Sequence, residues 1–289
     1  MNIVKHFLKL LVLYIRLLKC RFSSPKTGQL TSLTKLRIAN DNDTCVVIGN
    51  GPSLTNDMKE LIEKDGVDYF CVNHLAESEF FTLLKPNKYT LLDPYFWSKD
   101  TDEKLKRKRE NLFEALNDKV TWEMFLFLPR NADSNYLKSR IKNDHVIIVK
   151  LDVVPIIELH HAKLPNIFLK GKYAPPTCNV IIYAMYLAIL SRYKSIELYG
   201  ADLSFTEDVI VDQKTNQLQI EYKHFYGKST FEPLLQNPQR IVPFTMESLY
   251  KTTYLTFYAH NLLSKMAQLA GVRIVNRSSY SLIDAYDRE

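Results

Sequence analysis

Residues 45–54, which read CVVIGNGPSL, decide the fold. The apolar, β-branched run at residues 44–48 is typical of a buried strand, and it leads directly into the tight turn Gly49-Asn50-Gly51. Glycine lacks a Cβ atom, so this turn allows another group to approach its backbone closely. Residues 56–64 then show helical patterning, and the first N–H groups of such a helix are free to bind an anion. The stretch predicts a strand, turn and helix of a parallel α/β sheet, with a nucleotide phosphate at the turn.

The same alternation continues along the chain. We expect further strands at 68–73, 89–92, 121–128, 145–151, 195–199 and 272–275, and further helices at 102–117, 178–190 and 248–269. This order predicts a single doubly wound parallel sheet with helices on both faces, occupying residues 43–289. Residues 203–247 are polar and irregular, with a candidate hairpin at 209–211 and 218–222, and we expect them to form a lid.

Four polar residues follow predicted strands: Asn50, Asn73, Asp93 and Asp202. Ligands of open α/β sheets bind beyond the carboxyl ends of the strands, so these side chains should converge on one crevice. The turn lacks the third glycine of dinucleotide-binding proteins, and the second strand ends in Asn73 rather than in an acidic residue, which argues against NAD. A P-loop is excluded because no Gly-Lys-Ser or Gly-Lys-Thr follows the turn.

The amino-terminal segment carries the positive charge of the chain. Residues 1–40 contain eight Lys and Arg and no acidic residue, so a total charge of +6 leaves −2 for the rest, which gives no reason to expect nucleic-acid binding. A helix over residues 3–22 would place Lys5, Lys9, Arg16 and Lys19 opposite an apolar face. Its longest apolar run, residues 10–15, is too short to cross a bilayer.

We therefore expect residues 1–22 to lie on an anionic membrane surface, at the inner face of the cytoplasmic membrane. Residues 23–42 would form a linker. Packing of the helix on its own domain or on a second subunit is the alternative, and a homo-oligomer is compatible with the sequence.

Neither a metal nor a cofactor is expected. The four cysteines lack the spacing of a zinc or redox motif, which favours a reduced, cytoplasmic set of thiols. Asp100-Thr101-Asp102 has the form of a metal-binding Asp-x-Asp motif, but it opens a charged helix, where acidic residues are favoured by the helix dipole.

The turn at residues 49–54, the strand-end Asn73 and the stretch 193–202 resemble the bacterial sialyltransferases of glycosyltransferase family 42. They also resemble a wider group that includes pterin-pyrophosphokinase-like proteins. The resemblance extends in order over residues 44–284 and is closest at the turn and at Gly200-Ala201-Asp202. It implies a Rossmann-like domain with a lid, a CMP-sialic acid donor, a glycan acceptor and no metal.

The resemblance also implies a set of donor-binding residues. Asn50 and Ser53, in the turn with Gly49 and Gly51, would hold the donor phosphate and ribose. Asn73 would hold the nucleotide or the sugar, and Thr177 or Asn179 would lie near the cytidine. Asp93 replaces an Asn of the family, and Ser204 and Phe205 stand where the family has phosphate-binding tyrosines.

The general base of the resembled family is a His in a His-Tyr-x-Gly-His context of the lid. The matching residues here are His224-Phe225-Tyr226-Gly227-Lys228, with Lys at the catalytic position. We expect His224 to be the base because an imidazole titrates near neutral pH, whereas Lys228 would have to be desolvated. Asp202 or Asp93 is the alternative base, and Tyr226 or Lys228 would stabilise the departing phosphate. His160, His161 and His260 are expected to be surface or packing residues.

Together these features predict a glycosyltransferase that transfers a sugar such as sialic acid to a cell-surface or lipid-linked glycan, for example a lipopolysaccharide or a capsule. Two alternatives stay open. The first is another nucleotide-dependent enzyme, either a methyltransferase or a pyrophosphokinase. The second is a non-catalytic, membrane-associated nucleotide-binding module.

Overall fold

The computed structural model describes residues 2–25, 40–157, 159–223 and 229–288. Among them, a seven-stranded sheet forms the centre of the molecule, in the order β14-β8-β1-β2-β3-β4-β5, and every neighbouring pair in it is parallel. Its strands are β1 (Thr44–Ile48), β2 (Val67–Val72), β3 (Lys88–Thr90), β4 (Met124–Leu128), β5 (Val146–Lys150), β8 (Ser195–Tyr199) and β14 (Arg273–Asn276).

The strand order reverses direction between β1 and β8. From β1 the chain builds outward to β5, then returns to place β8 and β14 on the other side of β1. The prediction of a doubly wound parallel sheet is therefore confirmed, and β1 and β8 have the predicted bounds. This reversal places the turns that follow β1 and β8 side by side.

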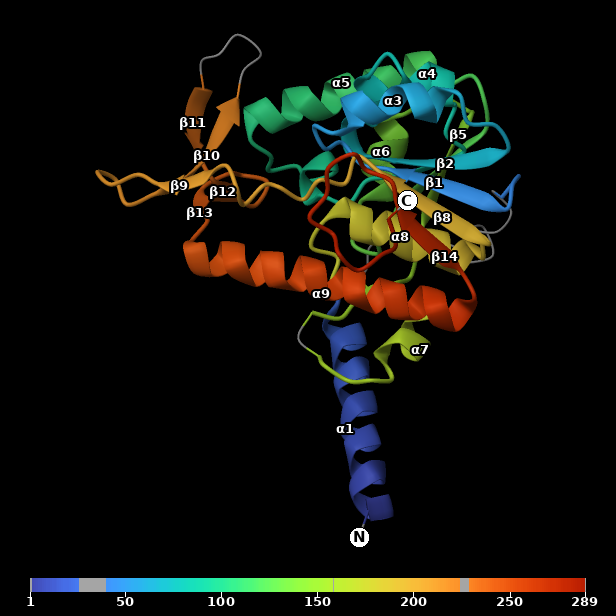
Figure 1. Cartoon of the computed structure of the whole chain (residues 1–289). Coiled ribbons are helices and arrows are strands. Elements are labelled where there is room, and N and C mark those ends of the chain that lie inside the picture. The colour runs from blue at the N-terminus through green and yellow to red at the C-terminus, as the bar shows by residue number, and fades with distance from the viewer. Residues whose placement is uncertain (1, 26–39, 158, 224–228, 289) are drawn as a thin grey trace.

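Helices cover both faces of the sheet (Figure 1). One face carries α3 (Leu54–Ile62), α4 (Phe81–Leu84), α5 (Glu103–Lys119) and α6 (Ser134–Arg140), whose apolar residues share one core cluster. The other carries α8 (Val180–Ser191) and α9 (Met246–Ala270), which belong to a second cluster. Nearly every residue of α8 is buried, because this helix lies between the sheet and α9. Its continuous apolar sequence, predicted as one helix at 178–190, has this physical origin.

The insertion after β8 contains its own antiparallel sheet. The predicted hairpin is present as β9 (Val209–Val211) and β10 (Leu218–Lys223), and β11 (Ser229–Pro233) adds a strand that the sequence did not predict. A short pair, β12 (Leu235–Gln236) and β13 (Val242–Pro243), follows. Lys104 of α5 forms an ion pair of 2.9 Å with Glu232 of β11, which joins the insertion to the start of α5.

The amino-terminal helix α1 (Asn2–Ser23) packs on the domain through one face only. Leu13 and Leu17 are 2% and 1% exposed and belong to the core cluster that contains α8. Near them lie the short elements β6 (Val154–Pro155), α7 (Leu164–Phe168) and β7 (Tyr173–Ala174). Arg21, at the end of α1, pairs with Asp152. For this face, packing on the helix's own domain, which we treated as the alternative, is the correct interpretation.

Other described side chains of α1 are exposed. Its amino-terminal part projects away from the body (Figure 1). Eight large apolar side chains of the described part of α1 are exposed: Phe7, Leu8, Leu11, Val12, Tyr14, Ile15, Leu18 and Phe22. Phe7, Leu11, Tyr14 and Leu18 share one face of the helix. In the part of the chain that the structure describes, no helix has both the length and the apolar character needed to span a membrane.

Candidate functional site

The carboxyl ends of β1, β2 and β3 surround a cavity of about 680 Å³. Asn50, Asn73 and Asp93, each predicted from its place after a strand, line this cavity together. His74, Tyr95 and Lys108 line it as well, and none of these three was singled out from the sequence. The amide of Asn50 donates to the carbonyl oxygen of Val72 (3.1 Å), so it bridges the ends of β1 and β2.

The two glycines of the first turn serve the packing of the chain on itself. A Cβ atom on Gly49 would lie 2.3 Å from the carbonyl oxygen of Gly200, and one on Gly51 would lie 2.1 Å from Oδ1 of Asp202. The N–H groups of Gly49 and Gly51 donate to the carbonyl oxygens of Tyr199 and Gly200, each at 2.8 Å. The close approach that we expected for a phosphate is therefore made by the neighbouring turn after β8.

Asp202 and Ser53 bind each other at this junction. Asp202 is 5% exposed, its Oδ2 accepts a hydrogen bond from the backbone N–H of Ser53 (2.9 Å), and its Oδ1 accepts one from the Ser53 hydroxyl (2.6 Å). Ser53 is the residue before α3, so a carboxylate of the chain already occupies the anion-binding end of this helix. Ser53, expected to hold the donor phosphate or ribose, and Asp202, an alternative base, are thus bonded to each other in this structure, where Asp202 fastens the turn.

Asn73 and Asp93 form the polar floor of the cavity. Asn73 adopts a left-handed backbone conformation (φ 47°), and its amide nitrogen lies 3.5 Å from Asp93 Oδ2. The Oδ1 atom of Asn73 is buried and has no hydrogen-bond partner among the described residues. Burial raises the pKa of Asp93, although the amide of Asn73 and the charge of Lys108 act in the opposite direction. The floor thus offers an acceptor that a ligand could satisfy and a carboxyl group that is easier to protonate than usual.

His74 is the titratable side chain of the cavity that most resembles a general base. Its Nδ1 contacts the Glu77 carboxylate and its Nε2 contacts the Tyr95 hydroxyl. Burial lowers the pKa of His74, as does the charge of Lys108, while Glu77 raises it. An imidazole held by a carboxylate on one nitrogen is the arrangement that proteins use for proton transfer. A sequence signal existed, because His74 directly follows the strand-end Asn73.

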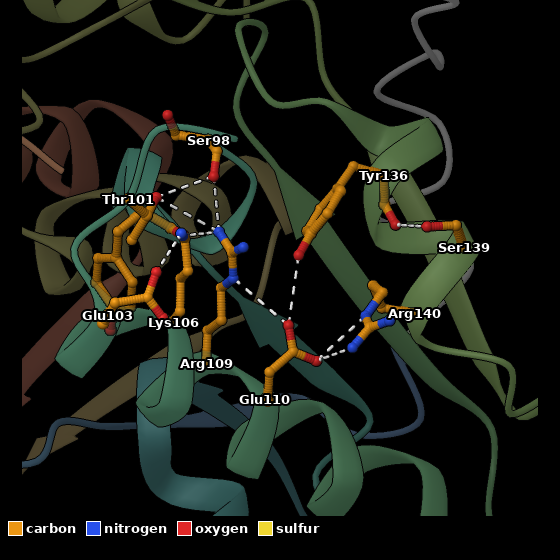
Figure 2. A network of polar contacts seen from close by, with 10 residues as sticks. Ser98, Thr101, Glu103, Lys106, Arg109, Glu110, Tyr136, Ser139 and Arg140 are labelled. Atoms are coloured by element: carbon orange, nitrogen blue, oxygen red, sulfur yellow. Dashed lines mark hydrogen bonds and ion pairs between the residues drawn. The ribbon is translucent and has the colours of Figure 1, made fainter. Parts of the chain in front are cut away.

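Helix α5 holds both rims of the cavity. One rim is the 3₁₀ turn η1 (Asn73–Glu77), and the other is the 3₁₀ turn η2 (Pro94–Phe96). The buried guanidinium of Arg109 donates to the carbonyl oxygen of Tyr95 (2.8 Å). It also donates to that of Ser98 (2.7 Å), as Figure 2 shows. The ammonium of Lys119 donates to three successive carbonyl oxygens at the end of η1, at 2.9–3.1 Å.

Residues of α6 support this arrangement. Glu110, next to Arg109, accepts hydrogen bonds from Tyr136 and Arg140 (Figure 2). The Arg109 guanidinium lies 5.0 Å from the centre of the Tyr136 ring. Because a buried cation needs such partners to be tolerated, the network holds Arg109 in place and, through it, η2.

The other predicted site residues lie elsewhere. Thr177 lines a second, smaller cavity, and the Oδ1 atom of Asn179 accepts from the N–H of Ile182 (3.0 Å), so Asn179 caps the start of α8. His224, Tyr226 and Lys228 lie outside the described residues.

Two further residues considered in the sequence analysis, Asp102 and His260, have structural roles. Asp102 caps α5 through hydrogen bonds from the N–H groups of Lys104 and Leu105. Within the described ranges, no group of three or more His, Cys, Asp or Glu side chains could hold a metal ion. His260 is fully buried and bonded to the Tyr286 hydroxyl (2.8 Å), and burial lowers its pKa to about 3, which confirms it as a packing residue.

No protein-family model matches the chain, and no curated protein is similar to it in sequence. Among solved structures, the fold is similar to that of the sialyltransferase CST-II in complex with a trisaccharide acceptor and CMP. The two chains are 12% identical, the match covers 85% of each, and the TM-score is 0.39.

Proposed function

We propose that the protein is a glycosyltransferase that binds a nucleotide-activated sugar in the cavity at the carboxyl ends of β1, β2 and β3. The observation that carries this proposal is the convergence of Asn50, Asn73 and Asp93 with the His74–Glu77 pair on one cavity. Its volume of about 680 Å³ lies within the range of cavities that bind ligands of nucleotide size.

The donor is a CMP-linked acidic sugar such as CMP-sialic acid, and the acceptor is a cell-surface or lipid-linked glycan. The sequence resemblance at the turn and at the Gly-Ala-Asp strand supports this choice. The charge of Lys108 suits a phosphate, and the amides of Asn50 and Asn73 suit sugar or nucleotide oxygens.

The reaction is a direct displacement without a metal ion. The acceptor hydroxyl oxygen bonds to the anomeric carbon while the bond from that carbon to the donor phosphate oxygen breaks. His74 takes the hydroxyl proton on its Nε2 after the Tyr95 hydroxyl moves aside, and Glu77 stabilises the resulting imidazolium. Lys108 stabilises the charge on the departing phosphate. His224, with Tyr226 or Lys228 as an aid to the leaving group, stays the competing assignment.

The enzyme works at the inner surface of the cytoplasmic membrane, bound through α1. Phe7, Leu11, Tyr14 and Leu18 form an exposed apolar face, and Arg16 and Lys19, also exposed, lie on the opposite, basic arc. An anionic bilayer satisfies both faces at once. A second copy of the helix would not, because residues 1–40 hold no acidic residue to pair with the basic side chains.

Isothermal titration calorimetry with a ligand panel tests the donor class. CMP should bind, whereas S-adenosylmethionine and ATP should not. Asn50→Ala should weaken CMP binding by about 1.5–3 kcal/mol, the value of one hydrogen bond to a charged group. Asn56→Ala is the matched control, because Asn56 is an exposed residue of α3 outside the cavity. Unchanged CMP affinity in a folded Asn50→Ala variant contradicts the assignment of the site.

Turnover assays separate the two candidate bases. His74→Gln should lower turnover by about 10² to 10⁴-fold with little change in CMP affinity, because the base contacts the acceptor. If His224→Ala or Lys228→Ala abolishes turnover and His74→Gln does not, the base belongs to the insertion.

A further inference from the structure

A second cavity, of about 240 Å³, lies between the end of α1 and the domain. Ser24 and Pro25, directly after α1, form one wall. The loop after β4 contributes Arg130, and the segment before α8 contributes Thr177. This cavity is adjacent to the larger one, since Leu92 lines it and the next residue, Asp93, lines the other.

Arg130 lines this cavity with a guanidinium that is only partly paired among the described residues. The residue is only 9% exposed, and its Nε and Nη1 atoms are buried with no hydrogen-bond partner among the described residues. Its ionic neighbour is Asp152, whose Oδ1 lies 3.6 Å from Nη1, beyond hydrogen-bond distance. A buried guanidinium is costly unless it is paired and hydrogen-bonded.

Asp152 cannot neutralise the site, because it is shared. Its Oδ2 pairs with Arg21 of α1, and its Oδ1 is itself buried without a hydrogen-bond partner in the described part of the chain. Two guanidinium groups therefore share one carboxylate, and these three described side chains together carry one net positive charge. An additional anion would offer acceptors to the unpartnered Nε and Nη1 atoms of Arg130.

We propose that this cavity is a second ligand site, which binds the carboxylate or phosphate group of a small molecule through Arg130. A guanidinium presents parallel N–H donors that match the oxygens of either group. Leu92, Val153 and Tyr183 supply apolar wall, and the Thr177 hydroxyl and the Asn131 amide supply polar contacts for the rest of the ligand. The volume suits a sugar acid or a sugar phosphate and is too small for a nucleotide.

The proposal does not depend on glycosyl transfer, because it rests on Arg130, Asp152 and the walls of this cavity alone. It assigns α1 a role besides membrane contact. Ser24, directly after the helix, forms part of the cavity wall, and Arg21 of the helix pairs with the Oδ2 atom of Asp152.

Direct binding measurements on the full-length protein test it. Glucuronate and inorganic phosphate are titrated separately by calorimetry in low-chloride buffer, with glucose as the uncharged control. At least one of the two anions should bind, and the one that binds more tightly identifies the group. Arg130→Gln should weaken binding by at least about tenfold, the effect of one lost charged hydrogen bond. Arg140→Gln is the control, since Arg140, on α6, pairs with Glu110 of α5 away from this cavity.

A second variant gives an effect of opposite sign. Asp152→Asn removes the competing carboxylate, so the anion should bind several-fold more tightly, which a merely structural role of Arg130 would not produce. It also decides the question if Arg130→Gln does not fold. Binding of neither anion, equal binding of glucose, unchanged affinity in a folded Arg130→Gln variant, or unchanged or weaker affinity in Asp152→Asn would each overturn the proposal.

Discussion

Replacing Asp202 with alanine distinguishes a structural carboxylate from a catalytic one. The variant leaves the N–H and the hydroxyl of Ser53 without their acceptors, and both lie in a buried environment. An unsatisfied buried donor costs about 1–3 kcal/mol, so the pair should lower the free energy of unfolding by about 2–6 kcal/mol. This is a large part of the 5–15 kcal/mol, roughly, that stabilises a typical domain.

Urea denaturation followed by circular dichroism measures this loss. Asp118→Ala, at an exposed position of α5, is the control and should stay within about 0.5 kcal/mol of the parent. Asp202→Asn should recover much of the stability, because its amide can accept from the Ser53 N–H and donate to the Ser53 hydroxyl. If Asp202→Ala keeps the stability of the parent and loses turnover, our structural assignment of Asp202 is wrong.

Three further predictions follow from the contacts. Glu77→Gln removes the charge that raises the pKa of His74, so an NMR titration should place the midpoint of the imidazole at lower pH. The acid limb of the pH–rate profile should move to lower pH with it. An unmoved midpoint would contradict the pairing of His74 with Glu77. Leu17→Ala should cost about 2–5 kcal/mol of stability in urea denaturation because Leu17 is buried, whereas Leu18→Ala should leave stability nearly unchanged and weaken sedimentation with anionic vesicles. Burial lowers the pKa of His260 to about 3 in the folded state, below the unfolded value of about 6.5, so the unfolded chain binds the proton first and stability falls as the pH decreases. Between pH 7 and pH 5 this proton uptake should lower the free energy of unfolding by about 2 kcal/mol. Urea denaturation at the two pH values should show that His260→Phe abolishes this loss.

The sequence predicted the sheet well because long apolar runs ended at recognisable turns. The bounds of β1 and β8 were correct, since each strand ends in a glycine turn. Short elements were missed: α6 has seven residues, and β6 and β7 have two each, too few for periodicity to identify.

The sequence located the strand ends correctly, but it did not predict that the turn at Gly49–Gly51 packs against the turn at Gly200–Asp202. A glycine that makes room for a phosphate and one that makes room for a neighbouring backbone have the same sequence signature. Ser53 and Asp202 are 149 residues apart, so their contact depends on the return of the chain to the centre of the sheet. His74 was missed for a similar reason, because its partner Tyr95 comes from a different strand end.

Helix α5 sets the width of the candidate active site. Arg109 fastens one rim and Lys119 fastens the other, and ten residues of α-helix separate their attachment points by about 15 Å along the axis. The helix therefore acts as a spacer of fixed length across the mouth of the cavity. While both clamps hold, α5 restrains the separation of η1 and η2, so a ligand too large to enter would have to detach one rim. Substitutions within η1 or η2 can consequently change which group is recognised while α5 still holds the two turns.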